Sequence, residues 1–155
     1  MHIRLTPVEA LGLAKLSGQA LPPVISSVAG DGDVLRVVLD LRRLDSLPGP
    51  LRLAVKIAPI VRADVRVESF ARGVATLAVE ANAAGLPAHK LLSLAAAPIE
   101  QAVAQQGLPP GVVDVQPDAR IAVDVERLLD ARMPGLTVSS LRVQDGQILV
   151  DGTVS

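Results

Sequence analysis

The sequence predicts an α+β protein in which a strongly curved antiparallel sheet of about seven to nine strands wraps around one long apolar helix, with a short N-terminal helix added. Three segments, 24–41, 65–81 and 138–154, each contain two alternating apolar strands joined by a polar turn with glycine. Residues 87–106 form a long helical candidate that is apolar around most of its circumference. A hairpin with one apolar face must cover that face to be stable, and this helix offers the surface to cover it.

Composition limits the ligands and the chemistry that the chain can use. Half of the residues are hydrophobic but Phe70 is the single aromatic one, so stacking on nucleobases or sugar rings is not expected. A formal charge of −1, with both signs interspersed, gives no electrostatic footprint for nucleic acid or for an anionic membrane surface. Cysteine is absent, which excludes disulfides and thiolate chemistry. We expect residues 1–155 to form a single domain with an aliphatic core.

The first predicted element is a helix over about residues 7–17. Thr6 is a suitable N-cap, Pro7 fits the first helical position, and Glu9 completes a capping box. The Leu-Pro-Pro run at residues 21–23 ends any helix and begins an extended segment.

Residues 24–81 are predicted to form an antiparallel strand meander. Apolar and charged residues alternate in segments 51–57 and 61–68, which predicts two strands, each with one solvent-exposed face. Segment 35–41 has the same period, so the first half of the chain is expected to supply about five strands.

The long helix is predicted over about residues 87–106. Gly85 and Leu86 precede it, and Gly107 ends it. Pro98 is expected to kink the helix because it removes one backbone hydrogen bond. Since apolar residues cover most of its circumference, we expect protein to enclose it.

A second strand group is predicted over residues 112–154. It comprises strands at 112–115 and 121–125, a short helix at 126–132, and a hairpin that turns at Asp145 and Gly146. Asp124 stands where it can cap the short helix.

Residues 120–154, RIAVDVERLLDARMPGLTVSSLRVQDGQILVDGTV, resemble the closing segment of LmeA-like phospholipid-binding proteins. The shared pattern is an x-V-x-V-D strand, a short Leu-rich helix, a P-G-L-x-V strand and an x-D-G-x-[IL]-x-V-x-G hairpin. LmeA-like proteins are similar to the tubular lipid-binding (TULIP) superfamily, whose curved sheet wraps a long helix and holds acyl chains in an apolar tunnel. The resemblance implies this fold and a bound lipid, and it transfers no individual ligand-contacting residue.

No group of residues has the spacing of a catalytic or metal site. His2 and His89 are the only histidines, and neither has a partner at metal-ligand spacing. The serine pairs at 26–27 and 139–140 lie outside a nucleophile elbow. The GDGD run at 30–33 lacks the terminal glutamate of a calcium loop, so a hairpin turn is the better interpretation. We expect a protein that is not an enzyme, with no metal and no cofactor.

Two functions fit these patterns. The first is non-enzymatic binding of a hydrophobic ligand, such as a lipid acyl chain or another aliphatic small molecule, in an aliphatic groove or tunnel. The residues expected to line it are Leu91, Leu92, Leu94, Ile99, Val103, Val55 and Val65. The alternative is a structural or self-assembly module with a filled core and no ligand, in which strand edges or the N-terminal helix mediate formation of a homo-oligomer.

The sequence also predicts a location. Residues 1–24 lack the continuous apolar run of a signal peptide, and no stretch approaches the ~20 apolar residues of a membrane span. A soluble, cytoplasmic protein is expected, and a mature exported form would have the same appearance.

Overall fold

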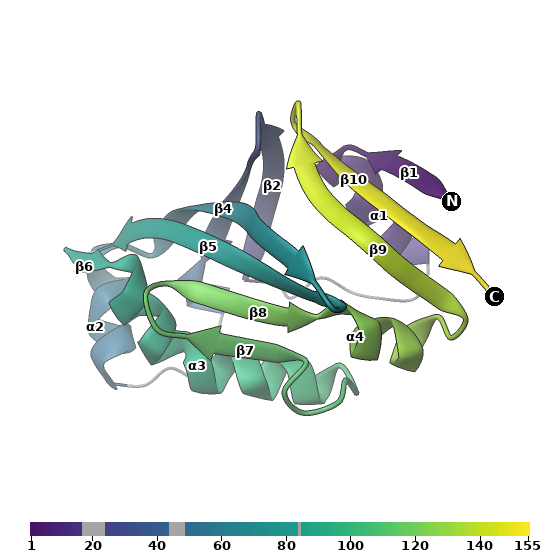
Figure 1. The fold of residues 1–155 in the computed structure, drawn as a ribbon. Helices are drawn as coiled ribbons and strands as arrows, with labels where there is room; N and C mark the ends of the chain where they lie inside the picture. Colours follow the sequence, from purple (N-terminus) through teal and green to yellow (C-terminus); the bar gives the residue numbers. More distant parts are fainter. Residues whose placement is uncertain (17–23, 44–48, 84) are drawn as a thin grey trace.

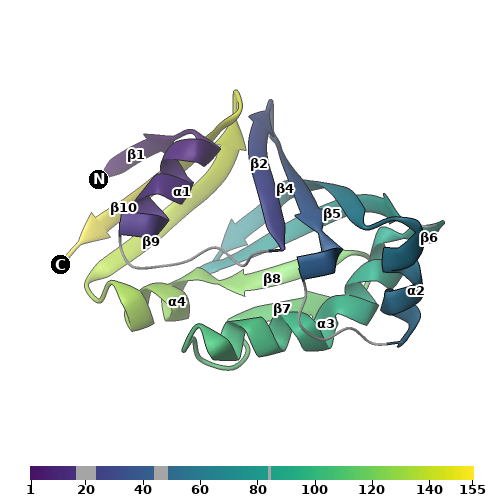
Figure 2. The same ribbon diagram turned by 180° about the vertical axis from the view of Figure 1, so that it is seen from behind.

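The computed structural model describes residues 1–16, 24–43, 49–83 and 85–155 (Figures 1 and 2). These residues form ten β-strands, four α-helices and one short 3-10 helix, and their strand pairings are all antiparallel. The prediction of an α+β protein built on antiparallel sheets is confirmed. The strands belong to two separate sheets and not to one.

The larger sheet contains the first two predicted hairpins. Its strands lie in the order β2 (Ile25–Asp31), β3 (Val34–Asp40), β4 (Ile60–Ala71), β5 (Val74–Ala83), β8 (Arg120–Asp124) and β7 (Val113–Gln116), and β6 (Leu86–Pro87) pairs with β5. The turn between β4 and β5 consists of Arg72 and Gly73, with φ angles of 54° and 78°. Two successive residues at positive φ match the twist of a tight hairpin, which explains why glycine stands there.

The smaller sheet holds the closing hairpin and a strand that the sequence did not predict. Its order is β1 (His2–Leu5), β10 (Gln147–Val154) and β9 (Leu136–Gln144). Strand β1 has only four residues and no turn signal beside it, so its pairing with β10 depends on contacts remote in sequence. The expectation of one continuous sheet is therefore wrong.

The two sheets meet at the tips of their hairpins, which lie beside each other in Figure 1. The backbone N–H of Gly146 donates to the carbonyl oxygen of Gly32 over 2.9 Å. A Cβ atom placed on Gly30 would lie 2.0 Å from the carbonyl oxygen of Gly146. Gly30, the first glycine of the GDGD run, thus permits a close backbone approach between the two hairpins.

Capping residues define two of the helices as the sequence indicates. Helix α1 (Pro7–Leu16) begins after Thr6, whose Oγ1 accepts from the N–H of Glu9 over 3.2 Å. Helix α4 (Val125–Arg132) begins after Asp124, whose Oδ1 accepts from the N–H of Arg127 over 3.1 Å. Both contacts satisfy an N–H that the first turn of a helix leaves without a partner.

The prediction of a strand over residues 51–57 is wrong, because these residues belong to helix α2 (Gly49–Ile57). Apolar residues at every second position also contain i,i+4 pairs, which share one side of a helix. Leu53 and Ile57 are such a pair, and both are exposed, whereas Val55 between them is half-buried. Pro50 in the first turn and the good helix formers after it favour the helix.

Helix α3 (Ala88–Gln105) is the longest helix of the described chain and runs along one face of the larger sheet (Figure 2). It continues through Pro98. None of its 18 residues is buried, so the expectation of a helix enclosed by protein is wrong. The sheet covers one side of α3, and Ala97 and Glu100 are exposed on other parts of its surface. The apolar side toward the sheet is half-buried.

Candidate functional site

An aliphatic groove lies between α3 and the larger sheet. Its volume is about 440 Å³, which falls within the ~300–1,000 Å³ common for small-molecule sites. Strands β2, β3, β4, β5 and β8 contribute apolar side chains to one wall, and α3 contributes the other. Among the described residues that line the groove, Gln106 is the only polar one.

The sheet wall follows from the alternation of side chains along each strand. Val37 of β3 and Ala63 of β4 are register partners, and both line the groove. Val65 and Val79 repeat this arrangement on β4 and β5. The residue before Val37 is Arg36, which lies on the opposite face and places its Nη2 2.9 Å from Oδ2 of Asp31.

The helix wall is built from residues spaced three and four apart along α3. Leu92, Ala95, Ile99 and Ala102 follow this spacing and line the groove. Two of these four side chains are alanine methyl groups, so they leave space that leucine would fill. The groove thus exists because small residues face the sheet at its centre.

A smaller recess of about 100 Å³ extends the groove toward the first residue of α3. Four residues line the recess alone, namely Val61, Ala81, Ala88 and Leu91. Six residues line both spaces: Leu39, Leu41, Ala63, Val79, Leu92 and Ala95. At 1.5 Å per residue, the 18 residues of α3 extend over ~27 Å. Groove and recess together follow most of that length, from Ala88 to Gln106.

The structure places most of the expected lining residues around these spaces. Leu92, Ile99, Val103 and Val65 line the groove, and Leu91 lines the recess. Leu94 lies outside both linings, because it is turned ~100° around the helix from Ala95. Its side chain is half-buried. Val55 lies outside them as well, on α2, where it packs against the buried pair Leu41 and Val61.

Sequence reasoning missed several lining residues. They include Val37, Leu39, Val79, Ala95 and Ala102. The strand residues carry the period-two signal that predicts an apolar face, and only the register between strands shows which of them oppose α3. The alanines carry a weaker signal, namely small residues at helical spacing on an otherwise leucine-rich helix.

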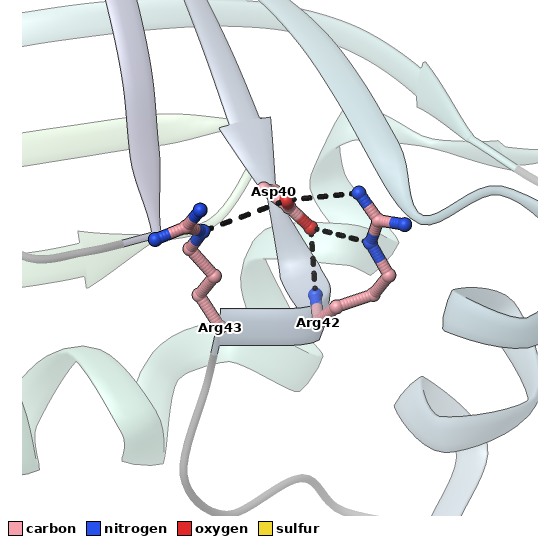
Figure 3. A network of polar contacts seen from close by, with 3 residues as sticks. All are labelled: Asp40, Arg42 and Arg43. Carbon is pink, nitrogen blue, oxygen red and sulfur yellow. Dashed lines mark hydrogen bonds and ion pairs between the residues drawn. The ribbon is translucent and has the colours of Figure 1, made fainter.

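A buried carboxylate fixes the chain where β3 ends beside the groove (Figure 3). Asp40 is 7% exposed. Its Oδ1 accepts from Nε of Arg42 over 2.9 Å, and its Oδ2 accepts from Nη2 of Arg42 over 3.0 Å. Nε of Arg43 lies 3.7 Å from Oδ2 on the other side. Between Asp40 and Arg42 stands Leu41, a buried lining residue whose position this bidentate pair holds.

The pKa of Asp40 provides a prediction about acid stability. The side-chain hydrogen bond from Arg42 is the main cause that holds this pKa below its usual 3.8, while partial burial opposes the effect. The unfolded chain therefore binds a proton at higher pH than the folded protein does. The stabilisation is complete above pH 3.8 and is lost as pH falls through the lower folded-state value.

We expect Asp40→Asn to be less stable than the wild-type protein at neutral pH, with a difference that shrinks as the pH falls below 3.8. Urea unfolding midpoints of both proteins across this range measure the difference. Asp151→Asn is a useful second variant, because contact with His2 lowers the pKa of Asp151 in the same direction. A difference between wild type and Asp40→Asn that does not change with pH would contradict the prediction.

No family model, curated protein or solved structure matches this chain. The candidate site is therefore judged on its own geometry.

The described residues hold no group of three or more His, Asp or Glu side chains that could bind a metal ion. Within the same part of the chain, no helix has the length and hydropathy needed to cross a bilayer. The arrangement can exclude water from an aliphatic molecule, and its lining offers one polar side chain, Gln106, for a directional contact.

Proposed function

We propose that this protein binds a ligand with a long aliphatic segment, such as a lipid acyl chain, in the groove beneath α3, and that it catalyses no reaction. The observation that carries the proposal is the groove of about 440 Å³ with aliphatic walls and Gln106 as the one polar lining residue of the described chain. Aliphatic walls suit flexible chains, since such chains gain affinity from buried area more than from directional contacts.

The free energy of burial sets a minimum length for this ligand. Each buried methylene contributes ~0.8 kcal/mol, and association costs ~4 kcal/mol or more in lost translational and rotational freedom. Micromolar binding needs a net ~8 kcal/mol. A purely aliphatic ligand must therefore bury about 15 methylenes to reach that affinity. We expect long-chain ligands to bind and short-chain ones to bind weakly.

The proposal also includes the curvature of the larger sheet and the family resemblance of residues 120–154. We interpret the larger sheet as one that curves around α3, as in the TULIP superfamily, and residues 120–154 as those of an LmeA-like protein. The order of strand β8, helix α4, strand β9 and strand β10 supports this interpretation, because it follows the order of elements in the family's closing segment.

A self-assembly module is the second candidate, and the exposed surface of α1 favours it. Val8, Leu13 and Leu16 are 72%, 51% and 86% exposed. Self-association through α1 would cover them. Sedimentation velocity of the wild-type protein and of Leu13→Ser/Leu16→Ser tests this candidate. An oligomer that dissociates in the double variant would support it, and a wild-type monomer would contradict it.

Displacement of a fluorescent long-chain fatty acid tests the proposed function. The protein has no tryptophan and no tyrosine, so its own fluorescence does not interfere. We expect the probe to become brighter on binding, and unlabelled fatty acids to displace it more effectively as their chain length rises. A probe that stays dark at micromolar protein concentration would contradict the proposal.

A further inference from the structure

Helix α2 presents an apolar surface to solvent. Leu53 and Ile57 are 64% and 76% exposed, and Ile60, at the start of β4, is 42% exposed. Lys56 is exposed and lies ~60° around the helix from Leu53, so its ammonium borders the apolar surface. We call the surface formed by Leu53, Lys56, Ile57 and Ile60 the α2 patch.

The opposite side of α2 packs against one end of the groove. Val55 contacts the core formed by Leu41 and Val61, which Leu91 also joins. Leu41, Val61 and Leu91 all line the recess that extends the groove. Figure 2 shows α2 beside the first residues of α3, at the same end of the molecule. The α2 patch thus faces outward from the point where the recess ends.

The chain around α2 carries a concentration of positive charge. Residues 40–62 have a net formal charge of +3. They contain five cations (Arg42, Arg43, Arg52, Lys56 and Arg62) and two acids (Asp40 and Asp45). The whole protein has a formal net charge of −1, so the residues outside 40–62 have a net charge of −4. The overall charge hides this asymmetry, which explains why composition alone predicts no attraction to an anionic membrane surface.

We propose that the α2 patch docks on an anionic lipid surface and brings the recess end of the groove to it. This inference rests on the proposed function. Membrane affinity of an interfacial helix depends on its buried apolar area and on the attraction of its cations to anionic lipids, and the α2 patch with its surrounding charge offers both. A second copy is a poorer occupant, because a two-fold contact through this patch would bring the positively charged surroundings of both copies together.

Vesicle flotation tests the docking surface. The protein is mixed with vesicles of phosphatidylcholine alone, or with vesicles of phosphatidylcholine and phosphatidylglycerol in equal parts. We expect the protein to float with the mixed vesicles and to remain behind with the neutral ones. Added salt should weaken the binding, because it screens the attraction between exposed charges. Equal binding to both vesicle types would overturn the electrostatic part of the proposal.

Variants locate the surface on the molecule. Lys56→Glu should weaken partitioning to the mixed vesicles about thirtyfold, since each charge near an anionic surface changes partitioning about fivefold. Leu53→Ser/Ile57→Ser should weaken it at least tenfold. The matched controls are Arg4→Glu on β1 and Val8→Ser/Leu16→Ser on α1, which change exposed residues of the same kinds. An equal loss in the controls would overturn the assignment to α2.

The fatty-acid probe, measured in the same protein samples without vesicles, separates the two proposals. Probe binding without flotation would overturn the docking surface and leave the groove as the ligand site. Flotation that depends on α2, without probe binding, would support the docking surface and contradict the proposed function. A wild-type dimer that Lys56→Glu or Leu53→Ser/Ile57→Ser dissociates would show that a second copy occupies the patch, and it would overturn the proposal.

Discussion

Ala95→Trp is expected to abolish binding of the fluorescent fatty acid while the protein remains folded. Ala95 lines both the groove and the recess, so an indole at this position occupies the space that the ligand needs. A ligand that loses half of about 15 buried methylenes would bind more than a hundredfold more weakly. The measurement is a titration of the probe with the wild-type protein and the variant.

Ala97→Trp is the matched control, because Ala97 lies on the same helix and is exposed. It should bind the probe with wild-type affinity. Ala95→Trp should also unfold at an equal or higher temperature than the wild-type protein, since an added side chain fills unoccupied apolar space. Wild-type affinity in Ala95→Trp would show that the ligand occupies another site.

Gly30→Ala is expected to destabilise the protein by about 1–3 kcal/mol, the range typical of overpacked sites. The new methyl group would lie 2.0 Å from the carbonyl oxygen of Gly146, which belongs to the backbone and cannot rotate away. The hairpin tips must separate, and the hydrogen bond from Gly146 to Gly32 is weakened or lost. Thermal unfolding followed by circular dichroism should show a melting temperature lower by about 2–12 °C.

Gly12→Ala is the control for Gly30→Ala. Gly12 lies within α1, and a Cβ placed there meets no atom within 4 Å. Alanine is a better helix former than glycine, so this variant should gain about 0.5–1 kcal/mol. If Gly30→Ala were as stable as the wild-type protein, the close approach of the two hairpin tips would be wrong.

The sequence predicts those parts of the fold that depend on neighbouring residues. The hairpin turns at Arg72–Gly73 and Asp145–Gly146 form where the polar, glycine-containing turns indicate them. The caps at Thr6 and Asp124 make the expected hydrogen bonds. Each of these features needs only a few residues in a fixed order, and their conformational preferences act within one turn of chain.

The assembly of the hairpins could not be predicted in the same way. Strand β1 pairs with β10, whose residues lie about as far from it in sequence as the chain allows. Its four residues alternate polar and apolar side chains, but so short a run does not identify a partner strand. The alternation in 51–57 fits a strand and an amphipathic helix equally well over so short a length, and packing of Val55 on the Leu41 core is compatible with the helix.

The sequence predicts the kind of site, an aliphatic groove, but identifies only some of the residues that line it. An apolar helix with aliphatic strands predicts a contact between them, and Leu92, Ile99 and Val65 line the resulting groove. Which side of α3 meets the sheet depends on tertiary packing, so the sequence could not separate Leu94 from Ala95. Apolar residues all around α3 predict an enclosed helix, whereas the structure leaves every residue of α3 at least partly exposed. That partial exposure keeps the groove open to a ligand.

The most direct test of the central claim is native mass spectrometry of the gently purified protein beside an organic extraction of the same sample. We expect a species heavier than the 16.1 kDa chain by the mass of one long-chain lipid, and the same lipid in equimolar amount in the extract. The bound species should be absent in Ala95→Trp and present in Ala97→Trp. A wild-type protein that shows only the mass of the chain alone, even after incubation with excess long-chain fatty acid, would contradict the proposed function.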